Sequence, residues 1–306
     1  PFAEQWLNEY AKPRLKVRTI DRYKQYAGRA YKAIGNLRID KINSRHIQKF
    51  VDSLKGLSSK TIRGYVSFIS TIFDYAVKQG MIKDNPCKNI ALPPLKQAQR
   101  ECYTLDEAQQ FIKLLEKEPI KYRILFTLAV YSGLRKGELL GLEWKDIDFE
   151  NCVITVNRAS LYSKSKGGTY TDTPKTKQSQ RALKLPVYVL DLLRQYRLYQ
   201  SEQRLKYGGQ WESDRVFTTG NGKPMGTSTP LKWLDNFFER TGTRKVTMHS
   251  LRHLNASLLI NAGADVKTVS AALGHSKAST TLNIYTHEFQ EAQAKASQAV
   301  ADVLSI

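Results

Sequence analysis

The chain has 306 residues, of which 41% are hydrophobic and 10% aromatic, so wholesale disorder is excluded. No apolar run approaches the ~18 residues that a membrane span needs, and no signal peptide opens the chain. The three cysteines form no CxxC pair, which argues against a disulfide framework or a zinc site and favours a reducing cytoplasm.

The charge is strongly basic along the whole chain. There are 48 lysines and arginines against 28 acidic residues, which gives a net charge of +20. Residues 1–95 contribute +11 and the remaining residues +9, so the charge is not confined to a tail. Such a field favours a polyanion, most simply nucleic acid, because phosphates supply affinity that does not depend on sequence. An anionic membrane surface is the competing interpretation.

The first 80 residues are predicted to form four helices. Apolar spacing and capping residues place them at about 2–12, 17–34, 43–56 and 58–80, with Pro13, Gly35, Gly56 and Gly80 as stops. We expect a small helical domain over residues 1–85. One corner of it gathers basic side chains, which form either a DNA contact or simply a solvated face: Lys12, Arg14, Lys16, Arg18, Arg22 and Lys24.

A proline-rich stretch over residues 86–103 predicts an extended linker. A capping box at Thr104–Glu107 then opens a second domain, residues 104–306. In chain order we expect helices to about residue 132 and at 136–142, a strand at 152–156, a hairpin over 158–173, a strand at 181–185, and helices from 187 to the end. The predicted fold class is therefore α+β, mostly α.

The usual cofactor signatures are missing. There is no phosphate-binding GxxxxGK[ST] loop, no GxGxxG after a strand and no HExxH, so we expect neither cofactor nor metal. Four of the five histidines lie within residues 249–287, and His249 and Arg252 share one helical face. Taken singly, each such residue has an ordinary structural explanation, for example an i,i+3 pair between Arg135 and Glu138.

Taken together, five separated elements occur in a known order. Gly133-Leu-Arg-Lys-Gly-Glu138, Pro174-Lys-Thr176, His249-Ser-Leu-Arg-His253, Leu273-Gly-His275 and Tyr285 resemble the tyrosine recombinases, the phage-integrase family. Within it the chain looks most like the integrases of phages and conjugative transposons. The resemblance covers residues 1 to about 300. One small departure is Leu254, where the family often has threonine.

The resemblance implies a catalytic set. Tyr285 would be the nucleophile that takes the scissile phosphate. Arg135 and Arg252 would clamp its non-bridging oxygens, a task that suits the rigid fork of donors on guanidinium. Lys175 would protonate the leaving 5′-oxygen. Covalent capture by a tyrosine conserves the energy of the cut bond, so rejoining needs neither ATP nor metal.

The remaining motif residues would assist. His249 would act as general base, which a phenol with a pKa near 10 requires, and His275 would donate a hydrogen bond to the phosphate. Glu138 would orient Arg135, and His253 would give structural support.

The family fold implies a helical core-binding domain and a mixed α/β catalytic domain that form a clamp around DNA. The implied reaction integrates and excises a mobile element by cutting and rejoining double-stranded attachment sites through a 3′-phosphotyrosyl intermediate. Four protomers and an excisionase are the expected partners. The family's usual small N-terminal domain has no counterpart here, and the chain opens on Pro1, so we expect a processed form or fragment.

Further DNA contacts are predicted outside the catalytic set. They are Arg18, Arg22, Lys60 and Arg63 in the helical domain, and Lys164 and Lys166 at the hairpin tip, where a solvated loop is the alternative. A final helix over 287–304 carries an apolar stripe, Phe289, Ala292, Ala296, Val300 and Val303. We expect it to dock on a neighbouring protomer, with docking on its own domain as the alternative.

Three other functions stay open. A type IB topoisomerase shares the arginine–tyrosine chemistry, and relaxation of supercoiled DNA without a specific site would favour it. A non-catalytic DNA-binding regulator on the same fold would form no covalent adduct. A structural protein that binds polyanions is more remote.

Overall fold

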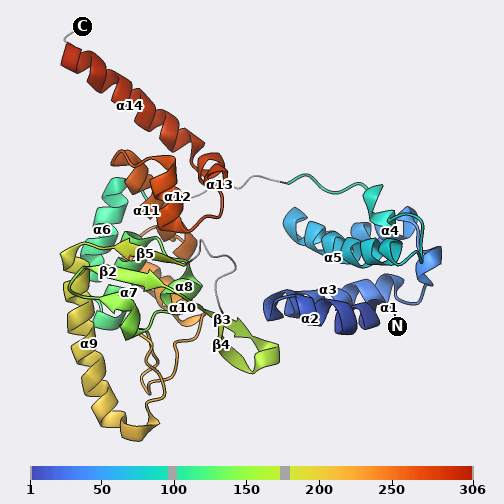
Figure 1. Cartoon of the computed structure of the whole chain (residues 1–306), viewed down its shortest axis with the longest axis horizontal. Helices are drawn as coiled ribbons and strands as arrows, with labels where there is room; N and C mark the ends of the chain where they lie inside the picture. The colour runs from blue at the N-terminus through green and yellow to red at the C-terminus, as the bar shows by residue number, and fades with distance from the viewer. Residues whose placement is uncertain (1, 96–101, 173–179, 305–306) are drawn as a thin grey trace. The chain divides into compact units, whose positions relative to one another are not determined.

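The computed structural model describes residues 2–95, 102–172 and 180–304, and the chain divides into two compact units. Unit 1 takes in Pro1–Gln99 together with Ser163–Gly168, and unit 2 takes in Arg100–Tyr162 with Thr169–Ile306. Figure 1 colours the chain from blue in unit 1 to red at the end of unit 2. Each unit has its own hydrophobic core.

Unit 1 is helical, as its apolar spacing predicts. Its elements are α1 (Phe2–Gln5), the π-helix η1 (Trp6–Ala11), α2 (Lys12–Arg14), α3 (Val17–Ile34), the short 3₁₀ turn η2 (Ile39–Lys41), α4 (Ser44–Ser53), α5 (Ser59–Lys78) and the 3₁₀ turn η3 (Pro86–Lys88). The side chains of Asn43 and Ser58 cap α4 and α5. Helical backbone runs on from η1 through Pro13 to Arg14 and ends at the extended Leu15, so the predicted end before Pro13 is two residues early.

The chain after η3 runs along unit 1 in extended form. The Gln48 amide bonds to both backbone groups of Ala91, accepting from its N–H at 2.9 Å and donating to its carbonyl at 3.4 Å. Arg63 donates to the Pro93 carbonyl at 3.2 Å. Ile90 and Leu92 pack on the core of unit 1. The predicted linker thus begins with the 3₁₀ turn η3 in place of extended chain, and the described residues that follow it, to 95, are extended and held on the helices.

Unit 2 surrounds an almost wholly buried helix. Its helices are α6 (Leu105–Leu115), α7 (Ile120–Ser132), α8 (Lys136–Leu139), α9 (Val187–Tyr207), α10 (Thr229–Thr241), α11 (Met248–Asn261), α12 (Val266–Leu273), α13 (Ala278–Ile284) and α14 (Thr286–Leu304). Every residue from Ile124 to Val130 of α7 is buried, as expected for a helix that is apolar all round. Both α9 and α11 pack against it.

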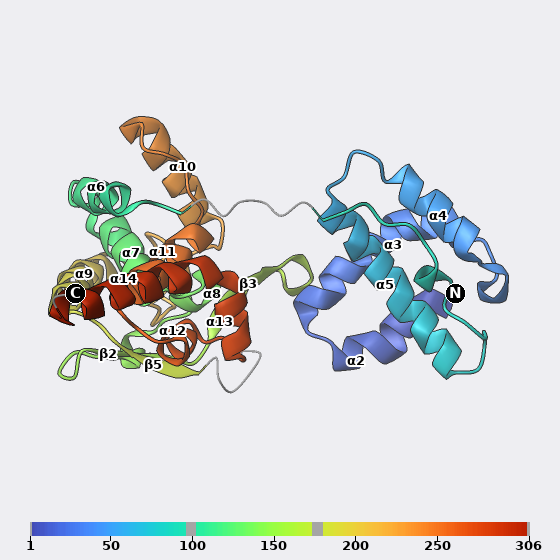
Figure 2. The same cartoon turned by 90° about the horizontal axis from the view of Figure 1, so that it is seen from above.

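A small sheet and the base of a two-stranded hairpin complete unit 2. Strands β1 (Ile147–Asp148), β2 (Val153–Val156) and β5 (Arg181–Lys184) form an antiparallel sheet in the order β1-β2-β5, and its register pairs Val156 with Arg181. The predicted hairpin is confirmed as β3 (Ala159–Ser163) and β4 (Gly168–Asp172), joined by the 3₁₀ turn η5 (Lys164–Lys166). Figure 2 places β2 and β5 along one edge of unit 2 and α10 at the opposite edge.

The backbone of β3 lies very close to α8. A Cβ on Gly141 would fall 2.8 Å from the Arg158 carbonyl oxygen, and one on Gly137 would fall 3.0 Å from that of Ser160. A buried guanidinium ties the same region together, because Arg215 donates to the Gly141 carbonyl and to the Thr171 hydroxyl of β4. The hairpin base and α8 are therefore fixed to one another.

Two predicted helical segments are shorter than their apolar pattern suggests. The helix predicted at 136–142 ends at Leu139. The segment between α9 and α10 is mostly irregular, with the 3₁₀ turn η7 (Gly208–Gln210) and an isolated bridge from Thr218 to Pro224. Gly208 and Gly222, both with positive φ, explain why the helical pattern does not continue there.

Candidate active site

Three arginines from three elements meet at the C-terminal end of α12. The last carbonyls of this helix accept hydrogen bonds from all three: Ala272 from Arg181 at 2.7 Å, Leu273 from Arg252 at 2.5 Å and Gly274 from Arg135 at 3.1 Å. The end of a helix leaves such carbonyls without helical partners and carries the negative end of the dipole. A guanidinium group donates hydrogen bonds to these carbonyls, and its positive charge is attracted by the negative end of the dipole.

Gly274 makes this convergence possible. It ends α12 in the left-handed conformation, with φ of 64°, and the His275 N–H then bonds back to the Ser270 carbonyl at 3.0 Å. A Cβ at this position would stand 2.7 Å from a guanidinium nitrogen of Arg181. The Leu-Gly-His motif therefore terminates the helix where the arginines need its carbonyls.

A buried carboxylate, Glu138, holds two of the arginines. It accepts from Arg135 Nη1 at 2.7 Å and from Arg181 Nη2 at 2.9 Å, and also from the Arg135 backbone N–H at 3.0 Å. Burial opposes its ionisation, but the positive charges of Arg181 and Arg135 prevail and lower the pKa of this carboxyl. Among the described residues, Arg135, Arg181 and Arg252 share the single carboxylate of Glu138, which leaves a surplus of positive charge.

The arginines differ in exposure. The side chain of Arg135 is 40% exposed and that of Arg181 only 7%. Arg252 is 2% exposed and also donates to the Gly133 carbonyl at 2.7 Å. Burial and the neighbouring Arg135 lower the pKa of Arg252 to about 9. A buried cation beside another cation is stabilised by a bound anion, so the cluster is suited to a phosphate.

A short turn positions Arg135 opposite α11. Gly133 adopts the left-handed conformation with φ of 58°, and its carbonyl thereby meets Arg252. Asn255 of α11 donates to the carbonyls of Val130 and Tyr131 at 2.9 and 3.0 Å, which fixes the end of α7 on α11.

Tyr285 lies at the junction of α13 and α14 and is buried in a small cluster with residues of α11 and α12. Its hydroxyl is 2.6 Å from His253 Nδ1. His249, one turn earlier on α11, stands edge-on to His253 with ring centroids 4.6 Å apart. Tyr285 is also within electrostatic range of Arg252. The nucleophile predicted from the sequence therefore lies beside the arginine cluster.

His275 stands next to the same cations as a neutral ring. Its Nδ1 is 2.8 Å from the hydroxyl of the fully buried Thr281. Burial, followed by the charges of Arg252, Arg135 and Arg181, lowers its pKa to about 4. If Thr281 donates to Nδ1, the proton of the neutral ring sits on Nε2, and that nitrogen is a hydrogen-bond donor at neutral pH.

The structure thus brings together seven of the eight residues predicted for this site: Arg135, Glu138, His249, Arg252, His253, His275 and Tyr285. Lys175 lies outside the described residues. Sequence reasoning missed Arg181, whose guanidinium completes the cluster. The only signal for it was its place at the start of the predicted strand at 181–185.

The other predicted DNA contacts lie elsewhere. Arg18, Arg22 and Lys60 are exposed on α3 and α5, and Arg63 is half-buried with its bond to Pro93. These two helices approach closely, since a Cβ on Gly64 would fall 2.4 Å from the Tyr26 hydroxyl. Lys164 and Lys166 are exposed at the hairpin tip, which belongs to unit 1, where the buried Ser163 hydroxyl donates to Asp21 and lowers the pKa of that carboxyl.

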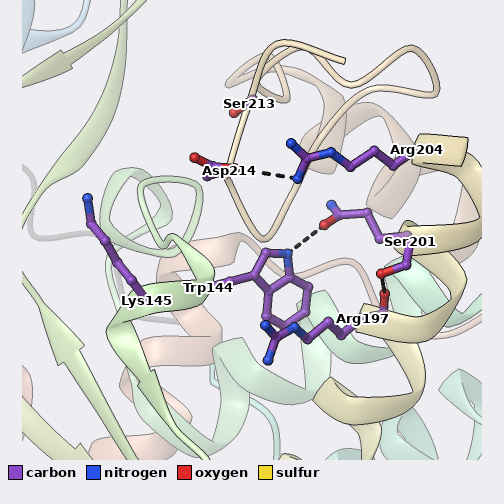
Figure 3. Close-up of a pocket in the computed structure, with 8 residues that line it drawn as sticks. Trp144, Lys145, Arg197, Ser201, Arg204, Ser213 and Asp214 are labelled. Carbon is purple, nitrogen blue, oxygen red and sulfur yellow. Dashed lines mark hydrogen bonds and ion pairs between the residues drawn. The ribbon is translucent and has the colours of Figure 1, made fainter. Parts of the chain in front are cut away.

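A pocket beside α9 shows a different arrangement (Figure 3). The indole N–H of Trp144, which lines this pocket, donates to the Gln200 side-chain oxygen at 2.6 Å, and the Arg197 guanidinium lies over the indole ring. Arg204 pairs with Asp214 at 3.6 Å. These polar groups are paired with one another. We therefore assign this pocket no catalytic role.

Two further features were sought in the described parts of the chain. None of the helices there is long and apolar enough to cross a membrane. No group of three or more histidine, cysteine, aspartate or glutamate side chains within 2–95, 102–172 and 180–304 could hold a metal ion.

Comparison with known proteins places these features in context. Residues 101–292 match the profile of the phage integrase family, and residues 1–55 match that of the phage integrase N-terminal SAM-like domain. A tyrosine recombinase XerC-like protein of Caldanaerobacter subterraneus is 35% identical over 97% of this chain and 81% of its own length. The ICEBs1 integrase of Bacillus subtilis is 30% identical over 87% and 72%, respectively.

Solved structures share the fold. The Tn1549 transposon integrase in complex with a circular intermediate DNA superposes with a TM-score of 0.79 at 23% identity, over 97% of this chain and 98% of that one. A lambda integrase tetramer bound to a Holliday junction gives a TM-score of 0.65 at 17% identity, over 92% and 76%.

Proposed function

The chain belongs to the phage integrase family and is a tyrosine site-specific recombinase, and from this premise we propose that Tyr285 is the nucleophile that cuts and rejoins DNA. The observation that carries the proposal is the position of its hydroxyl, bonded to a histidine and within electrostatic range of a buried arginine that has a surplus of positive charge around it. A phosphodiester is the anion that these cations would receive.

In the proposed cleavage step the Tyr285 oxygen attacks the phosphorus and the bond to the 5′-oxygen breaks. Arg135 and Arg252 hold the two non-bridging oxygens, on which negative charge develops, and backbone carbonyls fix both guanidiniums beforehand. Neutral His275 donates to the same oxygens, and Lys175 protonates the leaving oxygen. The product is a 3′-phosphotyrosyl bond, and attack by another 5′-hydroxyl reverses the step.

The proposed substrates are the double-stranded attachment sites of a mobile element, which the protein integrates and excises by successive strand exchanges. Two similar proteins support this assignment, because one is solved with a circular intermediate DNA and another with a Holliday junction. An excisionase is the proposed accessory partner. Because the substrate is the element's DNA in the cell, we place the protein in the cytoplasm.

We propose that residues 1–85 form the core-binding domain and 104–306 the catalytic domain, joined by 86–103, and that the two clamp the duplex. Exposed cations of unit 1, Arg18, Arg22 and Lys60, would contact phosphates, and Arg63 would do so once released from Pro93. Lys164 and Lys166 would add contacts from the hairpin tip. Shortening that hairpin to a two-residue turn should then reduce recombination, whereas unchanged recombination would mean that the tip is only solvated.

We further propose that the end of α14 docks on a neighbouring protomer in a synaptic tetramer. Phe289 and Ala292 pack on their own unit, but Val300 and Val303 farther along are 59% and 82% exposed. Figure 1 shows this end of α14 extending beyond the rest of unit 2. An exposed apolar stripe on a helix is stable when a groove receives it.

The tail proposal can be tested by a charge on the stripe. Val300→Asp with Val303→Asp should impair assembly on paired sites while binding to a single site is kept, and Lys295→Asp on the opposite face is the matched control. Assembly as good as that of the unchanged protein would contradict docking in trans.

The catalytic proposal is tested with a nicked duplex that carries the end of the mobile element encoding this chain. The nick traps the covalent product, which runs as a shifted band. Tyr285→Phe should abolish the band and keep DNA affinity, and Tyr188→Phe on α9 is the control. A band that persists in Tyr285→Phe would move the nucleophile elsewhere, and relaxation of supercoiled DNA without any site would instead favour a type IB topoisomerase.

A further inference from the structure

The phenol of Tyr285 has a specific partner among the histidines. His253 Nδ1 lies 2.6 Å from its oxygen, and the two ring centroids are 5.5 Å apart with planes inclined by 57°. Tyr285 is 2% exposed and His253 is half-buried, so the contact is part-buried. The family pattern directed attention to His249 as the base, but the nitrogen bonded to the nucleophile belongs to the residue after Arg252.

Two features hold His253 in this position. It sits on α11, whose first turn is closed by a capping box between Thr247 and Ser250. Both α12 and α14 pack against α11, and the turn between α13 and α14 carries Tyr285. The His253–Tyr285 contact is therefore built between packed helices, which is where a reacting pair needs to be held.

A phenol that attacks phosphorus has to lose its proton, and the acceptor must be within hydrogen-bond reach of it. We propose that His253 is that acceptor and hence a catalytic residue of the recombinase. The inference rests on the proposed function and deepens it. As the bond from the Tyr285 oxygen to phosphorus forms and the bond to the 5′-oxygen breaks, the phenolic proton moves to His253 Nδ1, and the leaving oxygen takes its proton from a separate acid. On rejoining, the imidazolium returns the proton to the departing phenol.

The surrounding charges suit this transfer. On α11 the ring of His253 faces His249, and Arg252 is the preceding residue. Arg252, Arg135 and Arg181 act together on His275, which follows α12. On α14, Glu288 lies one turn after Tyr285. At His275, burial and then these arginines oppose a positive charge on the imidazole and lower its pKa to about 4. A bound phosphodiester brings a negative charge that offsets this opposition, so proton acceptance is favoured when the substrate is present.

The test separates proton acceptance from positioning. His253→Asn places an amide oxygen near the position of Nδ1, so the variant keeps a hydrogen-bond acceptor but takes up no proton. Cleavage of the nicked duplex is measured under single-turnover conditions from about pH 5 to about pH 9. His249→Asn is the matched control on the same helix, and His253→Gln serves if the asparagine variant does not fold.

We expect the rate for the unchanged protein to fall at low pH, where the acceptor is already protonated. In His253→Asn the rate near neutral pH should drop about 10²–10⁴-fold and this acid limb should disappear, while DNA affinity stays the same. In His249→Asn the acid limb should persist. Loss of the limb in His249→Asn, or a normal pH profile in His253→Asn, would overturn the proposal. No adduct from the unchanged protein would instead overturn the proposed function itself.

Discussion

The arginines of the catalytic cluster and the basic residues of unit 1 carry the same charge in opposite settings. Arg181 and Arg252 are buried, and backbone carbonyls at the end of α12 fix them in place. Arg18, Arg22 and Lys60 are exposed on α3 and α5. A fixed, desolvated cation is costly until an anion arrives, whereas an exposed one costs little and is screened by salt.

This difference assigns catalysis to the buried arginines and DNA affinity to the exposed cations. Preorganised charges in a dry site stabilise the charge that develops during a reaction, since they need no reorganisation. Exposed charges release counterions from DNA and add affinity that depends on salt. Variants of the catalytic cluster are therefore expected to change the reaction rate or the stability of the fold, and variants of the exposed cations the salt-dependent affinity. A variant that changes both the reaction rate and that affinity would break the comparison.

The largest effect is expected at Lys175, which lies outside the described residues. If it is the general acid, it acts in the reaction, as the catalytic arginines do, and does not merely add to DNA affinity. Lys175→Ala should slow cleavage of an ordinary phosphodiester by about 10²–10⁴-fold at unchanged affinity. The loss should be much smaller with sulfur at the bridging 5′ position, because a thiolate leaves without a proton. Lys184→Ala on β5 is the control, and equal losses on both substrates would make Lys175 a phosphate clamp.

A second large effect is expected from Glu138, because it is the carboxylate that balances Arg135 and Arg181. Removing one partner of a buried ion pair leaves the other charge uncompensated, so Glu138→Gln should cost about 3–5 kcal/mol of unfolding free energy. Urea titration measures this loss. Added sulfate should recover part of it by supplying an anion to the cluster.

Glu107 provides the matched control for that measurement. It also pairs with an arginine, Arg244, at 2.7 Å, but at a more exposed site. Glu107→Gln should cost little, since exposed ion pairs are screened by solvent. Equal losses in the two variants would contradict the distinction between buried and exposed charges.

The contrast also explains which residues the sequence could reveal. Arg135, Glu138, Arg252, His275 and Tyr285 stand in motifs whose order and spacing identify them. Arg181 has no such motif, because it joins the cluster only through the β2–β5 register and the end of α12. Long-range contacts of this kind leave no periodic pattern in the chain.

The role of His253 could not be predicted for a related reason. Helical spacing places it about 40° around α11 from His249, on the same face, so spacing alone does not tell which of the two histidines meets the nucleophile. That depends on the turn between α13 and α14, which brings the Tyr285 hydroxyl to His253. Likewise, the spacing of apolar residues predicted helix between α9 and α10, but it takes no account of glycines with positive φ, which make this segment irregular.

A moderate effect of pH is expected from His275. Its folded pKa of about 4 lies below the ordinary value of 6.5, so the unfolded chain binds the proton first as pH falls. Stability is thus complete above about pH 6.5 and is lost as pH falls toward 4. Allowing for solvent screening, the loss is about 1 kcal/mol. His275→Asn should flatten this part of the urea-unfolding profile, while the exposed His287→Asn should leave it unchanged. A profile that stays the same in His275→Asn would contradict the assignment.

The smallest effect is expected from single cations of unit 1. Arg22→Ala or Lys60→Ala should weaken DNA binding only a few-fold, roughly equally for all sequences, because one exposed phosphate contact is lost among many. The slope of log affinity against log salt should become shallower by about 1 for each. Cleavage at saturating DNA should keep its rate, since no fixed charge of the catalytic cluster has moved. Lys41→Ala is the control, as that side chain lies 4.0 Å from Asp40 and is partly neutralised. A change in the cleavage rate at saturation, with the salt slope unaltered, would show that unit 1 takes part in the chemistry rather than in holding the DNA.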